Sequence, residues 1–126
     1  MTPQEIVTAF GQRLEAMPMV PPIVWEDQDA DPARPCLSVQ HVPVTREEVD
    51  IAGGGLWQTG YFVVTVMTER GGLAQEPHAI AAAILARFPK ATRLGGLVVT
   101  GARLASAGYP DGADWRLPVR IDYRLT

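Results

Sequence analysis

The stretch WQTGYFVVTVMTERGGLAQEPHAIAAAILARFP, residues 57–89, decides the fold of this chain. Residues 61–67 are rich in β-branched and aromatic side chains, which fit a pleated and half-buried surface, so we predict a strand there. Neither face of this strand carries a charge, and a strand that is apolar on both faces is normally covered on both. We expect the chain's own helices on one face, and another subunit is the candidate cover for the other.

A glycine turn and an amphipathic helix follow this strand. Gly71-Gly72 permits the backbone angles of a sharp turn. Pro77 suits the first turn of a helix, where a missing N–H costs nothing, and Pro89 ends the helix. One apolar stripe recurs at helical spacing, and we interpret it as core packing: Ile80, Ala81, Ile84, Leu85 and Phe88.

The N-terminal residues predict a second helix. Thr2 and Glu5 have the spacing of a capping box, in which each side chain binds the backbone N–H of the other residue. Pro3 stands at the favoured first helical position, and Pro18 ends the segment. An apolar stripe runs through the segment at helical spacing: Ile6, Val7, Phe10, Leu14 and Met17.

Further strands are predicted on both sides of the central stretch. Residues 36–42 and 97–104 read as strands, and residues 23–25 as a short strand or an edge segment. Residues 115–125 alternate most cleanly between apolar and charged positions, with Pro118 favouring an edge position or a bulge. Pro43 ends or bends the strand before it, and residues 44–56 form a loop or a long hairpin tip.

These elements predict an α+β fold in a single domain, residues 1–126. The order is helix, strand, strand, helix, strand, strand, and short turn-rich links favour antiparallel pairing. We therefore expect a mainly antiparallel sheet of about four strands packed on two helices. A chain of 126 residues is one domain by the usual length prior.

Composition bounds the class of function. The net charge of −3 argues against a protein that grips nucleic acid by charge alone. The single cysteine, Cys36, forms no internal disulfide, so the fold does not depend on an oxidising compartment. We expect no signal peptide and no membrane span, because no apolar run approaches the required length. The expected location is the cytoplasm, or a particle assembled there.

The search for catalytic, cofactor and metal signatures finds none that holds. Asp27, Asp29 and Asp31 resemble the start of a calcium loop, but Pro32 stands where the loop needs glycine. The three glycines at 53–55 lack the lysine and helix start of a phosphate loop. Cys36 and His41 are five apart on one predicted strand and face opposite ways, so they form no local nucleophile–base pair. We expect no enzyme, no cofactor and no metal.

Three sets of residues are candidates for contact with other proteins. In the long segment 44–56, exposed charges at Arg46, Glu47, Glu48 and Asp50 form either a solvated face or a contact with a neighbouring subunit. Trp57 is an interface anchor or a cover for the small core. The third candidate set lies on the charged face of the last strand and consists of Arg116, Arg120 and Arg124. This face is a solvated sheet face, a subunit interface or a lining for nucleic acid.

The order of these features resembles a known family. It is similar to the small tail terminator, or tail completion, proteins of long-tailed phages, prophages and gene transfer agents, with the tail terminator of phage lambda as the structural type. Where many relatives carry a Phe-Thr-Pro-type segment, this chain reads Trp25-Glu26-Asp27-Gln28. The resemblance lies in the opening helix, the acidic proline loop before residues 36–39, the strand at 60–64, the helix ending at Pro89, and the segment 115–121.

The resemblance implies structural work in a virion. Such proteins form a ring, commonly a hexamer, on the head-proximal end of the tail tube. The ring stops polymerisation of the tube and presents the surface for head–tail joining. Its expected partners are copies of itself, the tail tube protein and a neck or head-completion protein, while DNA only passes through the lumen. Assembly would take place in the host bacterial cytoplasm.

Two alternatives remain open at this point. A head-closure or adaptor protein of the neck would have the same general features. A small α+β ligand-binding domain belongs to a different class and requires a pocket with convergent polar groups. Cys36, His41 and Trp115 are the first candidates for the wall of such a pocket.

Overall fold

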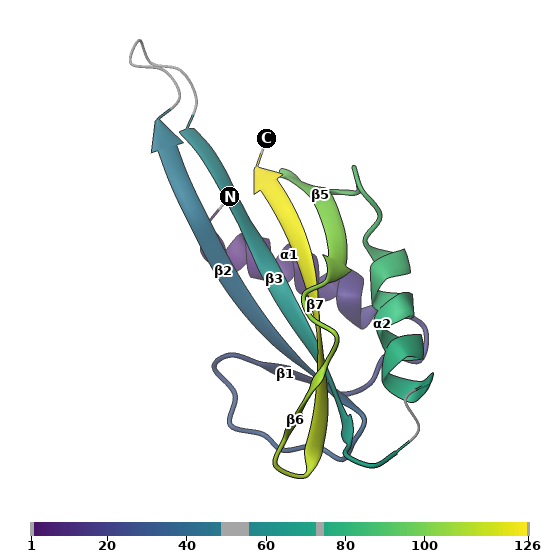
Figure 1. Ribbon diagram of the computed structural model, residues 1–126. Helices are drawn as coiled ribbons and strands as arrows, with labels where there is room; N and C mark the ends of the chain where they lie inside the picture. Colours follow the sequence, from purple (N-terminus) through teal and green to yellow (C-terminus); the bar gives the residue numbers. More distant parts are fainter. Residues whose placement is uncertain (1, 49–55, 73–74, 126) are drawn as a thin grey trace.

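The computed structural model describes residues 2–48, 56–72 and 75–125, and Figure 1 shows their arrangement. These residues form two helices and a seven-stranded sheet. The elements, in chain order, are α1 (Pro3–Glu15), β1 (Ile23–Trp25), β2 (Cys36–Glu48), β3 (Leu56–Glu69), α2 (Gln75–Arg87), β4 (Arg93–Leu94), β5 (Leu97–Leu104), β6 (Tyr109–Asp111) and β7 (Asp114–Leu125).

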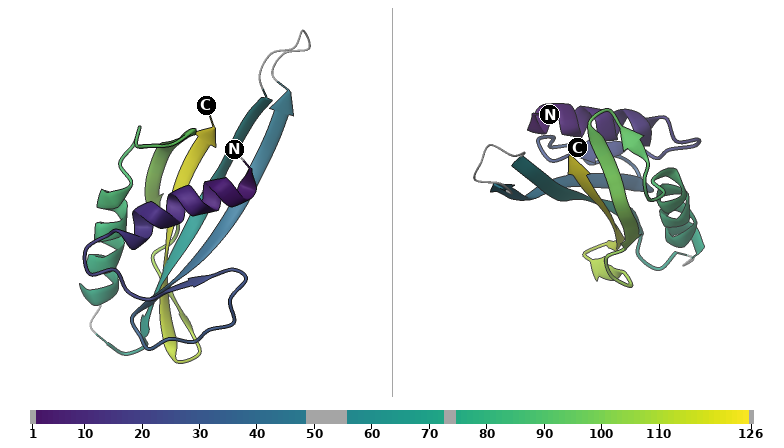
Figure 2. Two further views of the ribbon diagram at one scale, coloured as in Figure 1. Left: turned by 180° about the vertical axis from the view of Figure 1, so that it is seen from behind. Right: turned by 90° about the horizontal axis from the view of Figure 1, so that it is seen from above.

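The sheet is mixed and curls around the helices. Its strand order is β1-β2-β3-β7-β5-β4, with β6 paired to β7 beside this path. β1 pairs with β2 in parallel, and the other pairs are antiparallel. Both helices lie on one face of the sheet, here called the inner face, and the opposite outer face carries neither of them (Figures 1 and 2).

The α+β class is therefore confirmed, whereas the expected sheet of about four antiparallel strands was too small. The four long strands β2, β3, β5 and β7 match the predicted ones, and β1 matches the short segment predicted at 23–25. β4 and β6 were not predicted, because strands of two and three residues have no readable periodicity.

The two helices begin where their local chemistry predicts. At α1, the backbone N–H of Glu5 donates to the Thr2 hydroxyl, and the backbone N–H of Thr2 donates to the Glu5 carboxylate, so the capping box is confirmed. Pro77 lies in the first turn of α2, and that helix ends two residues before Pro89. Gly71 has a φ of 89°, as the predicted turn after β3 requires.

The core lies between the inner face and the helices. The Phe10 ring of α1 stacks on Phe62 of β3, with ring centroids 3.8 Å apart, and on Phe88 after α2 at 4.7 Å. Stacked aromatic rings in an apolar layer add to the stability given by burial alone. The remaining core side chains come from both helices, the turn after α1 and the four long strands: Ile6, Leu14, Met17, Leu37, Val39, Val64, Val66, Ala81, Ile84, Leu97, Val99, Leu117, Val119, Ile121 and Tyr123.

The hairpin of β2 and β3 reaches beyond the rest of the sheet. Pairing continues from Thr45↔Thr59 to Glu48↔Leu56, whereas the β3–β7 ladder ends at Thr59↔Arg124. Of the two readings of residues 44–56, the long hairpin fits their described part. Pro43 does not end β2; the register shifts between Pro43 and Thr45, which is the predicted bend. We call the paired residues 45–48 and 56–59 the hairpin arm.

Pro118 corrects the expectation of an edge strand, because β7 lies between β3 and β5. Proline is tolerated there for a local reason. The Pro118 carbonyl accepts a hydrogen bond from the Ala105 N–H, so the nitrogen of Pro118 also faces that side. The β5–β7 ladder ends at Leu104↔Val119 and the β6–β7 ladder begins at Tyr109↔Arg116, so Pro118 lies in the gap between them.

Candidate binding surfaces

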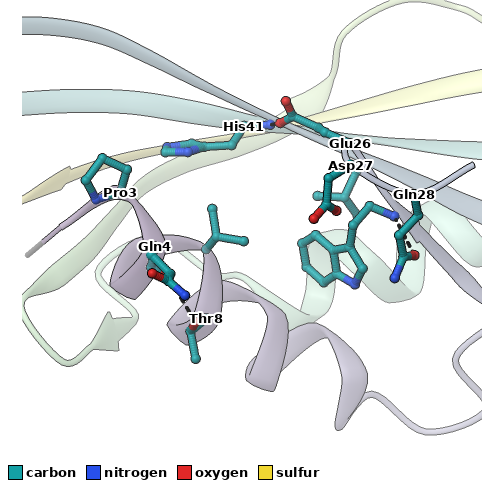
Figure 3. A pocket seen from close by; sticks show the side chains of 10 residues that line it. Pro3, Gln4, Thr8, Glu26, Asp27, Gln28 and His41 are labelled. Carbon is teal, nitrogen blue, oxygen red and sulfur yellow. Dashed lines mark hydrogen bonds between the residues drawn. The ribbon is translucent and has the colours of Figure 1, made fainter.

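A groove of about 630 Å³ lies beside the β1–β2 edge of the sheet. The first turns of α1, the residues that follow β1, and β2 form its walls (Figure 3). We call it the acidic groove, since the charged side chains among its described lining residues are two carboxylates. It is lined by Pro3, Gln4, Val7, Thr8, Trp25, Glu26, Asp27, Gln28, Val39 and His41.

Local packing fixes one wall of the acidic groove. The Trp25 indole lies against α1 at Gly11, where an added Cβ would come within 2.9 Å of the ring. Only glycine leaves this space, so Gly11 lets the indole lie flat beside the helix. The Gln28 side chain accepts a hydrogen bond from the Trp25 backbone N–H at 3.2 Å, which holds the turn that carries Glu26 and Asp27.

The carboxylates and His41 define the electrostatics of the acidic groove. Glu26 accepts a hydrogen bond from the backbone N–H of His41, and the Asp27 side chain extends into the groove (Figure 3). His41 Nε2 lies 2.6 Å from the Tyr123 hydroxyl. Burial lowers the pKa of His41, although Glu26 opposes this shift, and burial raises the pKa of Tyr123 to about 12. The groove is thus negative at neutral pH.

The outer face carries a chain of charged and aromatic contacts. The guanidinium carbon of Arg120 lies 3.7 Å from the centroid of the Tyr61 ring, which is a cation–π arrangement. Asp122 accepts from Arg120 Nε at 2.8 Å and from Arg103 at 3.0 Å. Arg103 remains the more exposed of the two arginines, with 61% of its side chain accessible. Arg116 Nε lies 2.8 Å from an Asp111 carboxylate oxygen.

A second ionic cluster attaches the acidic proline loop to β7. Arg34 donates two hydrogen bonds to Asp114, at 2.8 and 2.9 Å, and one to Asp31 at 2.7 Å. The Arg34 guanidinium lowers the pKa of the Asp114 carboxyl. Asp31 is therefore engaged in an ion pair. The described residues contain no group of three or more His, Cys, Asp or Glu side chains placed to hold a metal ion.

The structure places the predicted interface residues in two separate regions. Arg116, Arg120 and Arg124 share the outer face of β7, opposite Met67, Val63 and Thr59 of β3. Arg46, Glu47, Glu48 and Trp57 belong to the hairpin arm by their backbone pairing, and Asp50 lies outside the described residues. No observation tests contact with a partner, so these assignments stay predictions.

The three candidates for a ligand pocket do not converge. His41 lines the acidic groove, whereas Cys36 lies five residues away on β2 and is buried opposite Met67. Burial raises the pKa of the Cys36 thiol. Trp115 lines a different cavity of about 220 Å³ with Pro77 and His78. The side chains that accompany His41 in the groove, Trp25 and Asp27 among them, were not predicted as a site.

Comparisons with known proteins agree with this architecture. A family model described as "Phage tail terminator protein" matches residues 5–123. A solved structure whose name describes no function superposes with a TM-score of 0.77 at 26% identity, and the match covers 100% of this chain and 96% of the other. A search of curated proteins found no match. No helix of the described residues is long and apolar enough to cross a membrane. Because the family match spans most of the sequence, the chain belongs to the phage tail terminator family.

Proposed function

We propose that this chain forms a ring, commonly a hexamer in such proteins, on the head-proximal end of the tail tube. The ring stops polymerisation of the tube and presents the surface to which the neck or head-completion protein binds. As a member of its family, the chain is a structural component of the phage tail. The proposal adds three points to family membership: ring formation, the position at the head-proximal end of the tube, and the binding partners.

The hairpin arm is the observation that carries the proposal. It continues the β2–β3 ladder past the end of β7, so its two strands have no third strand beside them among the described residues (Figure 1). A two-stranded ribbon alone is marginally stable in water. An arm of this kind gains stability when it lies against a neighbouring protein, which supports a role in assembly.

The unpartnered edges of the sheet support self-association. β1 covers β2 only from Leu37 to Val39, and β4 covers β5 only at Leu97 and Val98. Beyond these points no described strand pairs with either outer edge. Contacts between two different surfaces of one chain generate a ring when the rotation closes. The two open edges offer such a pair of different surfaces.

The test is a variant in which residues 46–58 are replaced by Asn-Gly, a two-residue turn that suits a hairpin. We expect this variant to fold with an unchanged melting temperature but to form no rings and leave the tail tube uncapped. Light scattering measures the rings, and negative-stain imaging with the tail tube protein measures capping and tube length.

A Met19→Ser variant is the control, because that side chain is 98% exposed and lies outside the arm, four residues after the end of α1. It should cap tubes as the wild type does. Capping by the shortened variant would contradict the role of the arm. A wild-type protein that neither self-associates nor binds tubes would contradict the ring itself and favour the neck adaptor.

A further inference from the structure

The acidic groove has the chemistry of a receptor for a basic side chain. Glu26 and Asp27 supply negative charge (Figure 3). The Trp25 indole adds an aromatic ring to the lining. A guanidinium or ammonium group is attracted both to carboxylates and to the face of an indole. The floor is apolar, with Val7 and Val39, and suits the methylene stem that carries such a group.

The opposite edge of the sheet presents a side chain of the matching chemistry. Arg103 lies near the end of β5, with 61% of its side chain exposed and one guanidinium nitrogen on Asp122. Its neighbour Leu104 is one of the large apolar side chains that remain exposed. An exposed arginine matches a groove that has two carboxylates, and its methylene stem matches the apolar part of the lining.

The two surfaces lie at the same level along the strands. Cross-strand pairing connects them in one row that runs through Gln40, Val63, Arg120 and Arg103. The neighbours of Gln40 on either side, Val39 and His41, line the acidic groove. The sheet therefore carries an acidic receptor at one edge and a basic projection at the other, with no offset along the strand direction.

This placement decides what repeated contact would build. Two different surfaces that meet between successive copies give a closed ring when the operation is a pure rotation, and an open helix when a translation is added. Surfaces at one level across the sheet favour rotation about an axis roughly along the strands. A rotation without translation is the operation that relates successive copies in a ring.

We propose that the acidic groove of one copy receives Arg103 of the next copy, and that this contact joins neighbouring subunits of the ring. The inference rests on the proposed function, because it names the surfaces through which the ring forms. The occupant is a second copy of this chain. In this contact the Arg103 guanidinium lies between Asp27, Glu26 and the Trp25 face.

Charge reversal at each surface, followed by the exchange of both charges, tests the contact. Asp27→Arg and Arg103→Glu should each weaken self-association by about tenfold or more, since each places like charges together. The double variant should recover most of the loss, because the opposite charges again face one another. Sedimentation measures self-association in solution. For caps that form only on the tube, imaging of tube ends measures the association.

Matched variants separate this contact from general charge effects. Asp29→Arg reverses an exposed acid in the same loop outside the groove, and Arg93→Glu reverses an exposed arginine on β4; both should associate like the wild type. Arg103→Lys should retain at least part of the affinity, because lysine keeps the charge. Melting temperatures within a few degrees of the wild type verify that each variant folds.

Each outcome bears on one proposal in particular. Wild-type rings with full association of both single variants would overturn this contact and leave the proposed function standing. Loss of tube capping by Asp27→Arg with intact rings would also overturn it, because the groove would then bind the tube protein. A wild type that forms neither rings nor caps would overturn the proposed function first, and this contact with it.

Discussion

The two faces of the sheet are built from the same strands and differ in character. On β3, Phe62, Val64 and Val66 are fully buried beneath the helices, whereas their alternating neighbours Tyr61 and Val63 are half-exposed on the outer face. The inner face is apolar, and the outer face carries paired arginines and aspartates. The sequence of β3 alone did not separate the faces, since both are uncharged. The residues of the neighbouring strands, apolar on the inner face and charged on the outer face, distinguish the two faces.

The difference between the two faces separates the residues that stabilise the fold from those that are available for contact. Burial under α1 and α2 makes the inner face the main source of folding free energy. Exposed ion pairs contribute little to stability. The outer face and the sheet edges are thus free to be shaped for binding, and changes there should affect assembly more than folding.

The largest expected difference between the faces comes from two adjacent residues of β3. Phe62→Ala removes a fully buried ring stacked on Phe10 and should lower the free energy of unfolding by about 3–5 kcal/mol. Tyr61→Ala removes a half-exposed ring under Arg120 and should cost about 1 kcal/mol. Urea unfolding measures both. Similar losses at the two positions would break the comparison.

A pair of glycines sharpens the comparison. Gly60→Ala, in β3, would bring the new methyl group within 2.5 Å of the Tyr123 hydroxyl and 2.9 Å of the Val42 carbonyl oxygen. We expect a loss of about 1–3 kcal/mol in the free energy of unfolding. The control is Gly101→Ala in β5, where nothing lies within 4 Å, and its stability should stay level or rise by up to about 1 kcal/mol. A neutral Gly60→Ala would mean that the tyrosine moves aside without cost.

The smallest expected effect concerns His41, a titratable side chain within the otherwise apolar inner layer. Burial lowers its pKa, so the unfolded chain binds the proton more readily once the pH falls below about 6.5. Stability should therefore be full above that pH and fall below it, by at most about 1.4 kcal/mol per pH unit for one proton.

The measurement is urea unfolding between pH 7.5 and 5, as a difference between variants. His41→Gln should remove part of the pH slope, since glutamine does not titrate. A slope in His41→Gln equal to that of the wild type would show that the slope arises from other groups.

Local chemistry explains which elements could be predicted. The capping box at Thr2 and the prolines near both helix ends act within a few residues, so the helices were predicted closely. The alternation of apolar and charged residues in 115–125 indicates a strand with one buried face, and it predicted β7. The position of β7 at the centre of the sheet depends on which distant strands pair, so Pro118 was misread as a sign of an edge.

The acidic groove was missed for a related reason. Its walls come from α1, the segment after β1, and β2, and no spacing rule joins residues that meet only through the fold. The segment Trp25-Glu26-Asp27 offered a partial signal, because an aromatic ring followed by two acids is a combination that attracts cations. Asp27 was considered only as the start of a calcium loop, which Pro32 rules out. Contacts of the arm and of the outer arginines stay predictions.

Pro43 bears on the solubility of the chain. Leu37 and His41 point their backbone N–H groups away from β3, toward Pro22 and Glu26, so the nitrogen two residues further along faces the same open edge. That nitrogen carries no hydrogen. An incoming strand would find a missing donor and a shifted register at this point, and both features discourage fibril-like stacking. Pro43 thereby protects the exposed edge of β2 against edge-to-edge aggregation.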